Sequence, residues 1–436
     1  MPADGKVVPW YRCLLVALPG WVVARLIVLS AFALADRPEA LIGDAAWYHD
    51  LGVRGYGPYG AEGARFFPLL PAAVAVGVGL GVPAAVWQLA VCWVAALVFA
   101  AALVRLTVRE SGDEAAGHRI AWLIQLVPGA NVLVLGYPEA LAGLLAVAYF
   151  LALRSLAAGA PAPGSARGVG IGVGVGFLSG LARPAGPLLA LPGFVEAVRS
   201  AFGGDRPKDA DGGDGTKAQK GGKAQEGEKA RDSDKARDGG KAQEGAKAQS
   251  GGKAQGDDDG RDRAKRRGAG RGGGVGRSLA RWGPWLVAVA PLAGTGGYLA
   301  WAWWALGDPL APYRAYLTAN LSESVTVWEL LPGTAPGGYP WALVLLLATA
   351  AGVALYLCGR RLPFAYLAWA VPMLALAVTV WGVPSLPRYL AAVFPLWMAL
   401  AIVVRDRRLW LTLMTASIVG FVWVAWLTIA PDGPIP

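Results

Sequence analysis

The sequence repeats uninterrupted apolar runs of about 18 residues or more, the length that an α-helix needs to cross the hydrocarbon core of a bilayer. These runs are continuous series of Leu, Val, Ala and Trp, whereas the strands of a membrane β-barrel read as short alternating segments. Backbone polar groups in lipid must be satisfied internally, so runs of this kind favour helices. With 55% hydrophobic and only 16% charged residues, the chain is predicted to be an all-α polytopic membrane protein.

About 11 membrane-spanning helices are predicted along the chain. They lie near residues 12–35, 84–106, 119–136 and 138–157, in a broken pair within 168–199, and near 281–306, 340–357, 362–381, 387–404 and 409–430. The first run is too long for the apolar part of a signal peptide, so we expect an uncleaved span. The broken pair should meet at "RPAG", where Arg183 and Pro184 interrupt the apolar run. The short piece 66–82 is expected to be interfacial or re-entrant.

Cationic residues gather in short loops that this topology places on one side of the membrane. They are Lys6, Arg12, Arg105, Arg109, Arg119, Arg154, Arg167, Arg360, Arg361, Arg405, Arg407 and Arg408. The positive-inside rule makes these loops cytoplasmic, so we predict a multi-pass plasma-membrane protein with a cytoplasmic N-terminus. The net charge of +10 therefore reflects topology, and no nucleic-acid partner is expected.

Residues 203–277 have a different composition from the rest of the chain. "KAQ" or "KAR" recurs every six residues between Lys217 and Lys253, and apolar side chains are almost absent. Such a segment cannot bury a core, so we predict a disordered cytoplasmic linker. Its basic end favours a cytoplasmic location. Contact with anionic lipid headgroups or RNA is one interpretation of the segment, and a low-complexity expansion in a tolerant loop is the favoured one. The linker separates an N-terminal module, 1–200, with its first extracytoplasmic loop at 36–83, from a C-terminal module, 281–436.

The first extracytoplasmic loop carries a candidate catalytic carboxylate, Asp44. The spacing of Trp47, Tyr48 and Leu51 predicts a short helix that lies in the membrane interface with its aromatic face toward the lipid. Asp44 either caps this helix or serves as a general base, and the two roles are compatible. His49 is a weaker candidate, because exposed polar residues are common in loops.

Three further charged residues lie at the predicted outer ends of spans. Glu139 follows Pro138 in a first helical turn, where the helix dipole stabilises an acid, so its role is either structural or functional. Arg183 is a cation in an apolar context, which usually marks an ion or substrate partner. Arg388 either snorkels to the interface or joins Arg183 in a clamp for a phosphate.

Other kinds of site have no pattern in this sequence. No phosphate-binding loop and no GxGxxG after a strand is present, so a cytoplasmic nucleotide donor has no visible site. Cys13, Cys92 and Cys358 lack CxxC spacing and support neither a disulfide framework nor a zinc site. No metal site is predicted, and a divalent metal has no ligand pattern to support it.

Five segments carry a resemblance to a known family. In "GDAAWYHDLGVRGYGPYGAEGARFFPLLP" the matching residues are Asp44, Trp47, Tyr48, Gly55, Tyr56, Phe66, Phe67, Pro68 and Pro71. The other segments, in order, are "YPEALAGLL", "LSGLARPAG", "GDPLAPYRAY" and "LPRYLAAVFPL". Together they resemble the PIG-V-like mannosyltransferases of the GT-C glycosyltransferase superfamily. Gly43 departs from that pattern, which usually has Trp there, and Pro312 and Tyr313 interrupt the usual aromatic of "GDPLAPYRAY".

The resemblance implies a GT-C fold and an inverting transfer of mannose from a polyprenyl-phosphate carrier to a glycan, lipid or protein acceptor. Asp44 would act as the base or position the acceptor, and Arg183 and Arg388 would hold the donor phosphate. Glu139, Tyr48 and His49 would line the substrate site. Two alternatives stay open: a transporter or flippase of a lipid-linked sugar, although the internal repeats typical of transporters are not seen, and an inactive assembly subunit.

Overall fold

The computed structural model describes residues 8–37, 39, 41–157, 164–202, 273–323, 352–379 and 382–430. Nearly all of the predicted linker at 203–277 and the larger part of the predicted span at 340–357 lie outside the described residues. The described helices before residue 203 and those after residue 276 belong to one compact unit. The division into two transmembrane modules stays a prediction.

Helices account for all the regular structure of the described residues. The first half contains α1 (Trp10–Leu34), α2 (Asp44–Arg54), α3 (Gly60–Ala64), α4 (Leu69–Gly79), α5 (Ala84–Ser111), α6 (Glu114–Leu126), α7 (Glu139–Ala157), α8 (Gly164–Ala182) and α9 (Ala190–Phe202). Three short 3-10 helices interrupt it: η1 (Gly57–Tyr59), η2 (Ala130–Leu133) and η3 (Gly186–Leu189). The second half contains α11 (Gly273–Leu306), α12 (Ala311–Glu323), α14 (Phe364–Thr379), α15 (Gly382–Ala392), α16 (Phe394–Val403) and α17 (Arg407–Ile429).

Five of the described helices are long and apolar enough to cross a membrane: α1, α5, α7, α11 from Trp282 onward, and α17. A sixth candidate is the pair α15 and α16, which bends by 67° between Ala392 and Phe394. The structure thus supports an all-helical membrane protein, but not the predicted count of 11 spans. Helices α4, α8 and α14 are apolar but shorter.

Proline explains why two of the predicted spans are not single helices. The predicted span 119–136 stops at Leu126, because Pro128 disfavours a helical Val127, whose ψ is 148°. The predicted span 387–404 breaks at Val393, and Pro395 opens the next helix. The break expected at "RPAG" is confirmed, since α8 ends at Ala182 and η3 and α9 follow.

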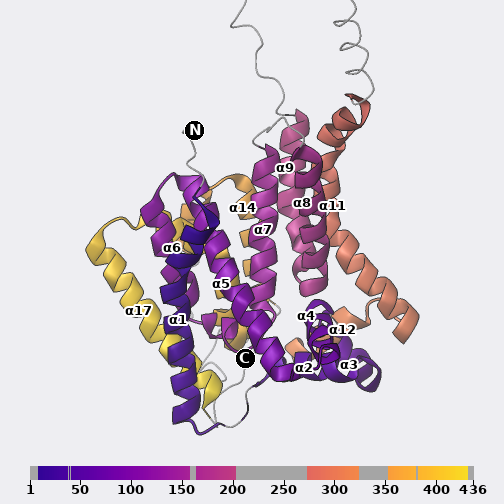
Figure 1. Ribbon diagram of the computed structural model, residues 1–436, viewed down its shortest axis with the longest axis vertical. Coiled ribbons are helices and arrows are strands. Elements are labelled where there is room, and N and C mark those ends of the chain that lie inside the picture. Colours follow the sequence, from indigo (N-terminus) through magenta and orange to yellow (C-terminus); the bar gives the residue numbers. More distant parts are fainter. Residues whose placement is uncertain are drawn as a thin grey trace, which may run out of the picture. The chain divides into compact units, whose positions relative to one another are not determined.

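The first loop forms three short helices beside the long ones (Figure 1), with α2 packed against α4. Within segment 66–82, which was predicted to be interfacial or re-entrant, the helix is α4, and it is only 11 residues long. In the long-helix part, α5 packs against α1, α6 and α7, and α7 packs against α8. This arrangement places the start of α2 near the first residues of α7.

The predicted cytoplasmic cations meet at one end of these helices. Arg109 donates to the backbone oxygen of Arg154 at 2.6 Å, and Arg154 pairs with Glu110 at 2.7 Å. Arg105 donates to the backbone oxygen of Val8 at 2.7 Å, which ties the beginning of α1 to the last turns of α5. The opposite end holds the end of α1 and the beginnings of α2 and α7. Which side of the membrane each end faces stays a prediction.

Candidate functional site

Four charged residues from distant parts of the chain form a connected set of ion pairs, here called the charged network. Arg388 donates from Nη1 to Asp44 Oδ2 at 2.7 Å and from Nε to Glu139 Oε1. Arg183 donates from Nη1 to the same Oε1 at 2.9 Å. Each contact is a charge-assisted hydrogen bond, the strong class of hydrogen bond in proteins. Glu139 therefore sits between two arginines, and one of these arginines also holds Asp44.

Three members of the charged network lie at helix ends, and the fourth lies inside a short helix. Asp44 is the first residue of α2 and Glu139 is the first residue of α7. Arg183 directly follows α8, and Arg388 lies within α15. Helix N-termini favour carboxylates because of their unpaired N–H groups and the helix dipole. The fold thus brings two acids to helix starts and joins them through arginines from other helices.

For two residues the structure contradicts one of the interpretations that the sequence leaves open, while their roles in catalysis and phosphate binding stay predictions. Asp44 does not cap α2, because the capping residue is Gly43 and no side chain makes a cap hydrogen bond there. Arg388 does not snorkel, because its side chain is 5% exposed and is paired with two carboxylates. The Asp44 and Arg388 side chains instead form an ion pair with each other.

The helix that carries Arg388, α15, packs very closely against the backbone at Gly129, and this close packing brings Arg388 to the charged network. A Cβ atom on Gly129 would lie 2.2 Å from the backbone carbonyl of Pro387 and 2.6 Å from the nitrogen of Arg388. Gly129 also has a φ of +88°, in the left-handed region that favours glycine. A side chain at this position would therefore push α15, and Arg388 with it, away from Glu139.

Gln88 connects the two segments that carry the carboxylates. Its amide nitrogen donates to the backbone oxygen of Ala45, next to Asp44, and to that of Gly136, three residues before Glu139, both at 2.9 Å. Other donors from α1 and α5 bind neighbouring carbonyl oxygens: Arg25 to Leu133, Trp93 to Val134 and Cys92 to Tyr137. Non-helical backbone among membrane helices needs such partners. These donors hold the approach to α7 in place.

Tyrosines surround the two arginines. The guanidinium carbon of Arg388 lies 4.7 Å from the ring centre of Tyr137, and that of Arg183 lies 5.1 Å from the ring centre of Tyr389. Arg183 also donates to the Tyr389 hydroxyl at 3.4 Å, and that hydroxyl lies 3.2 Å from the hydroxyl of Tyr316. These contacts combine cation–π attraction with hydrogen bonding in a site that is largely closed to water.

Tyr48 is buried beside the network, and its ring packs edge-on against Phe66. Burial raises the pKa of the Tyr48 hydroxyl well above its ordinary value, and the nearby charges of Arg183, Asp44, Glu139 and Arg388 also act on it. The phenol therefore stays protonated and can serve as a hydrogen-bond donor. The prediction that this face of α2 points toward the lipid is wrong for Tyr48 and Leu51, because both are buried in a cluster with Phe66. A role for Tyr48 in substrate binding stays a prediction.

His49 is not part of the charged network. Its Nδ1 lies 3.1 Å from Oδ1 of Asp50, and Tyr59 donates to the other oxygen of Asp50 at 3.3 Å. Successive residues of a helix lie about 100° apart around its axis, so His49 points in a different direction from Tyr48. In the described residues, His49 makes no contact with Glu139, Arg183 or Arg388.

Exposure separates the two carboxylates of the network. The Asp44 side chain is 32% exposed, whereas the Glu139 side chain is 2% exposed. Glu139 Oε2 is buried without a hydrogen-bond partner in the described residues. Two positive and two negative groups balance in charge. Asp44 is therefore the member that a molecule from outside reaches first, and Glu139 is the inner acid that holds the arginines.

Several residues that complete this site were not singled out in the sequence. Tyr137 and Tyr389 lie within "YPEALAGLL" and "LPRYLAAVFPL", two of the segments that carry the family resemblance, and this position is the signal that would have found them. Gln88 and Arg25 are polar residues inside apolar runs, a pattern that marks functional or structural importance in membranes. Their partners lie 43 to 108 residues away, which no local pattern reveals.

No metal-binding group is found in the described part of the chain. No cluster of three or more His, Cys, Asp or Glu side chains has the required arrangement there. Cys13, Cys92 and Cys358 are free and buried.

The fold and the site together define a helical membrane protein with a buried carboxylate–arginine network at one end of its helices. The sequence matches no known family profile and no curated protein. Among solved structures, it is similar to the archaeal oligosaccharyltransferase AglB from Archaeoglobus fulgidus in complex with an inhibitory peptide and a dolichol-phosphate. The TM-score is 0.46 and the identity 14%, over 96% of this chain and 56% of that one.

A second structure, the A. fulgidus oligosaccharyltransferase tethered to an acceptor peptide that contains the NVT sequon, gives the same TM-score of 0.46. The identity is 15%, over 96% of this chain and 55% of that chain. The present chain thus spans just over half the length of both proteins.

Proposed function

We propose that this chain is a membrane glycosyltransferase of the GT-C type. It would transfer a sugar, mannose according to its sequence motifs, from a polyprenyl-phosphate donor to a hydroxyl group of a glycan, lipid or protein acceptor. The observation that carries the proposal is the charged network, in which only Asp44 is substantially exposed while Glu139 and Arg388 are buried. Such an arrangement offers one accessible base in front of two fixed cations.

Asp44 is the proposed general base. It accepts the proton of the acceptor hydroxyl while the hydroxyl oxygen attacks C1 of the donor sugar. The bond between C1 and the phosphate oxygen breaks, and its electron pair leaves with the polyprenyl phosphate. Attack from the face opposite to the leaving phosphate inverts the configuration at C1.

Arg183 and Arg388 are the proposed partners of the donor phosphate. Guanidinium groups fit phosphate oxygens in pairs and stabilise the charge that develops on the leaving group. Before donor binding, Nη1 of Arg388 is bound to Asp44. The donor phosphate would replace Asp44 at this nitrogen, and Asp44 would then be free to face the acceptor. Glu139 would hold both arginines in place throughout.

Position relative to the cationic loops supports an extracytoplasmic site. The charged network lies at the opposite end of the helices from Arg105, Arg109 and Arg154, which the positive-inside rule assigns to the cytoplasm. Donor and acceptor would then meet on the outer face of the plasma membrane. There, a lipid-linked sugar is the kind of donor that remains anchored beside the enzyme.

A direct test compares membranes from cells with and without the gene, supplied with radiolabelled polyprenyl-phosphate mannose. We expect gene-dependent transfer of label to an acceptor, and its loss in the Asp44→Asn variant. Full transfer by Asp44→Asn would overturn the assigned mechanism. Gene-dependent movement of the labelled donor between leaflets, without transfer to an acceptor, would instead support a transporter.

A further inference from the structure

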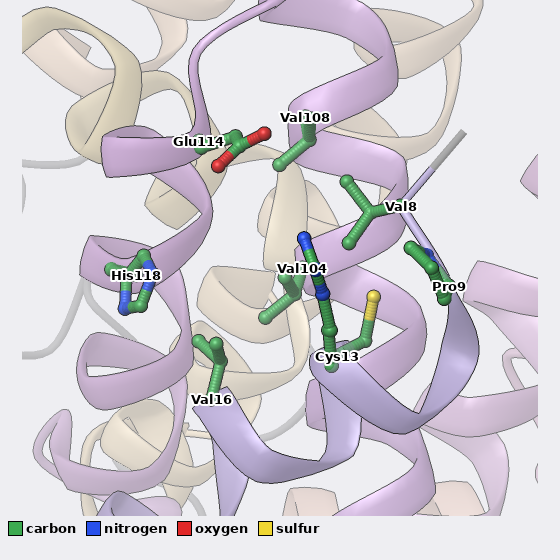
Figure 2. A pocket seen from close by; sticks show the side chains of 9 residues that line it. Val8, Pro9, Cys13, Val16, Val104, Val108, Glu114 and His118 are labelled. Atoms are coloured by element: carbon green, nitrogen blue, oxygen red, sulfur yellow. The ribbon is translucent and has the colours of Figure 1, made fainter. Parts of the chain in front are cut away.

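A cavity lies at the end of the helices away from the charged network (Figure 2). Its volume is about 380 Å³, and its lining comes from the beginning of α1, the last turns of α5 and the first turns of α6. This volume falls within the usual range of small-molecule sites, roughly 300–1,000 Å³. None of its lining residues belongs to the charged network. Because α1 has 25 residues at about 1.5 Å each, the cavity and Asp44 lie near opposite ends of a full span.

Helical spacing explains how three helices build the wall of this cavity. Val104 and Val108 of α5 are four residues apart, and so are Glu114 and His118 of α6. Residues at this spacing lie on one face of a helix. Val16 of α1 completes the apolar side, and Figure 2 shows these side chains arranged around one space. The wall is therefore apolar on one side, with polar groups from α6 on the other.

Two residues of opposite charge line the cavity without forming an ion pair with each other in the described residues. Arg12 and Glu114 both line it, yet neither makes an ion pair in the described residues. The hydrogen bond of the Arg12 side chain is to the neighbouring Tyr11 hydroxyl, at 3.3 Å. Two other acids at this end have cationic partners, since Asp113 pairs with Arg119 and Glu110 with Arg154. Arg12, Glu114 and His118 thus offer a cation, an anion and an imidazole to a ligand.

Exposed aromatic residues place this cavity at the depth of lipid headgroups. Trp10 and Tyr11, in the first turn of α1, are 45% and 59% exposed. Trp and Tyr concentrate where the hydrocarbon core meets water, because their rings are amphipathic. A ligand in the cavity would therefore find its charged partners at headgroup level and Val16, Val104 and Val108 beside it.

We infer that this cavity binds the headgroup of a zwitterionic membrane phospholipid, one that carries a phosphodiester and an ammonium group as phosphatidylethanolamine does. Arg12 and His118 donate to the phosphate oxygens, and Glu114 accepts from the ammonium group. The glycerol and the start of the acyl chains lie against the valines. A phospholipid with an anionic headgroup but no amine would satisfy Arg12 and leave Glu114 without a partner.

Native mass spectrometry of the purified full-length protein tests this inference. The delipidated protein is titrated with phosphatidylethanolamine or with phosphatidylglycerol, and bound lipid is counted. We expect phosphatidylethanolamine to bind more tightly, and Arg12→Gln and Glu114→Gln each to weaken it by about tenfold, as the loss of one charge-assisted hydrogen bond predicts. Glu114→Gln should leave phosphatidylglycerol binding unchanged or improved. Equal binding of the two lipids by the wild-type protein would overturn the inference.

Two further variants guard against general effects of charge and folding. Arg408→Gln removes an exposed cation at the same end that does not line the cavity, and should leave lipid binding unchanged. Val16→Phe fills the cavity while keeping all three polar residues, and should reduce phosphatidylethanolamine binding without lowering the thermal midpoint. If Val16→Phe binds as well as the wild type, or if Arg408→Gln loses as much as Arg12→Gln, the lipid is held elsewhere.

Soluble glycerophosphoethanolamine separates the lipid from its headgroup. Because the valine wall contributes to binding, this compound should not displace phosphatidylethanolamine at equal concentration. Displacement at equal concentration would show that the site takes a free phosphoamine and not a membrane lipid. That result would overturn the inference as stated.

Discussion

Arg388 binds Asp44 across 344 residues of sequence, with Nη1 of the guanidinium 2.7 Å from Oδ2 of the carboxylate. The two partners differ sharply in exposure, since Arg388 is 5% exposed and Asp44 32%. The arginine is therefore fixed by its surroundings, while the aspartate lies at the open side of the pair. This asymmetry suits a carboxylate that must exchange a protein partner for a substrate during each reaction.

Asp44→Asn should abolish most sugar transfer. The amide keeps the size of the side chain but cannot take a proton, and general-base catalysis typically contributes about 10²–10⁴-fold. We expect kcat to fall by about 10² or more, with little change in the amount of folded protein, because Asp44 is partly exposed. The measurement is initial rate against donor concentration in purified membranes.

The matched control for Asp44 is His49→Gln on the same helix. His49 contacts Asp50 and lies outside the charged network, so the rate should stay within about threefold of the wild type, as is usual for exposed polar positions. A comparable loss in both variants would show that α2 matters as a whole and that Asp44 has no special role.

Glu139→Gln should destabilise the protein itself. Glu139 holds both arginines through one oxygen. Without its charge, Arg183 loses its carboxylate partner and Arg388 keeps only Asp44. Removing one partner of a buried ion pair typically costs about 3–5 kcal/mol. We expect a clear fall in the thermal unfolding midpoint in detergent. Glu62→Gln, at an exposed position of α3, is the control and should leave the midpoint unchanged.

Gln88→Met tests whether the link between Ala45 and Gly136 positions the carboxylates. Methionine has a similar volume but leaves both backbone oxygens without their donor, at a cost of about 1–3 kcal/mol each. Small displacements of reacting groups are costly, so kcat per folded molecule should also fall by about tenfold or more. Both stability and initial rates need to be measured.

Gln125→Met provides the comparison for Gln88. Gln125 is also buried; it donates to the backbone oxygen of Ala96 and accepts from Nη1 of Arg25, and neither hydrogen bond involves Asp44 or Glu139. We expect Gln125→Met to lower the free energy of unfolding by a similar amount, without changing the rate of sugar transfer per folded molecule. Equal losses of rate in both variants would contradict a positioning role for Gln88.

Gly129→Ala should displace α15. The new Cβ would meet the backbone of Pro387 at 2.2 Å, and the left-handed φ of +88° adds about 1–3 kcal/mol of strain for a non-glycine residue. We expect lower stability and loss of transfer, because Arg388 moves with Pro387. Gly296→Ala is the control: no heavy atom lies within 4 Å of its Cβ position, and alanine should be neutral or slightly stabilising in a helix. An unaffected Gly129→Ala protein would show that α15 adjusts freely.

Long apolar runs made helices such as α1 and α5 predictable, because their length and continuity leave few other structures in a bilayer. Predicted spans differ from the described helices where a proline ends a helix early, as Pro128 does after α6. A hydrophobicity value averaged over a window of residues changes little when one of them is a proline. That proline nevertheless lacks a backbone N–H donor and restricts the conformation of the residue before it.

The candidate site was predictable in part. Asp44, Glu139, Arg183 and Arg388 stand out because charge is costly in an apolar sequence, and the structure brings all four together. What the sequence does not show is their pairing, since the two arginines were expected to be free for a phosphate. Pairing depends on contacts between helices 44 to 344 residues apart, which no local spacing encodes.

Cysteine labelling tests the predicted orientation of the charged network. Ala61 lies at an exposed position of α3, within the same first loop, 36–83, as Asp44. In intact cells, Ala61→Cys should react with a membrane-impermeant thiol reagent, because we place this loop outside. A cysteine within residues 217–255 should react only after the cells are opened. The native Cys13, Cys92 and Cys358 are buried, so the unmodified protein is the control and should give a low background. The reverse pattern, with labelling in the 217–255 segment and none at position 61, would place Asp44 in the cytoplasm and remove the basis for a lipid-linked donor on the outer face.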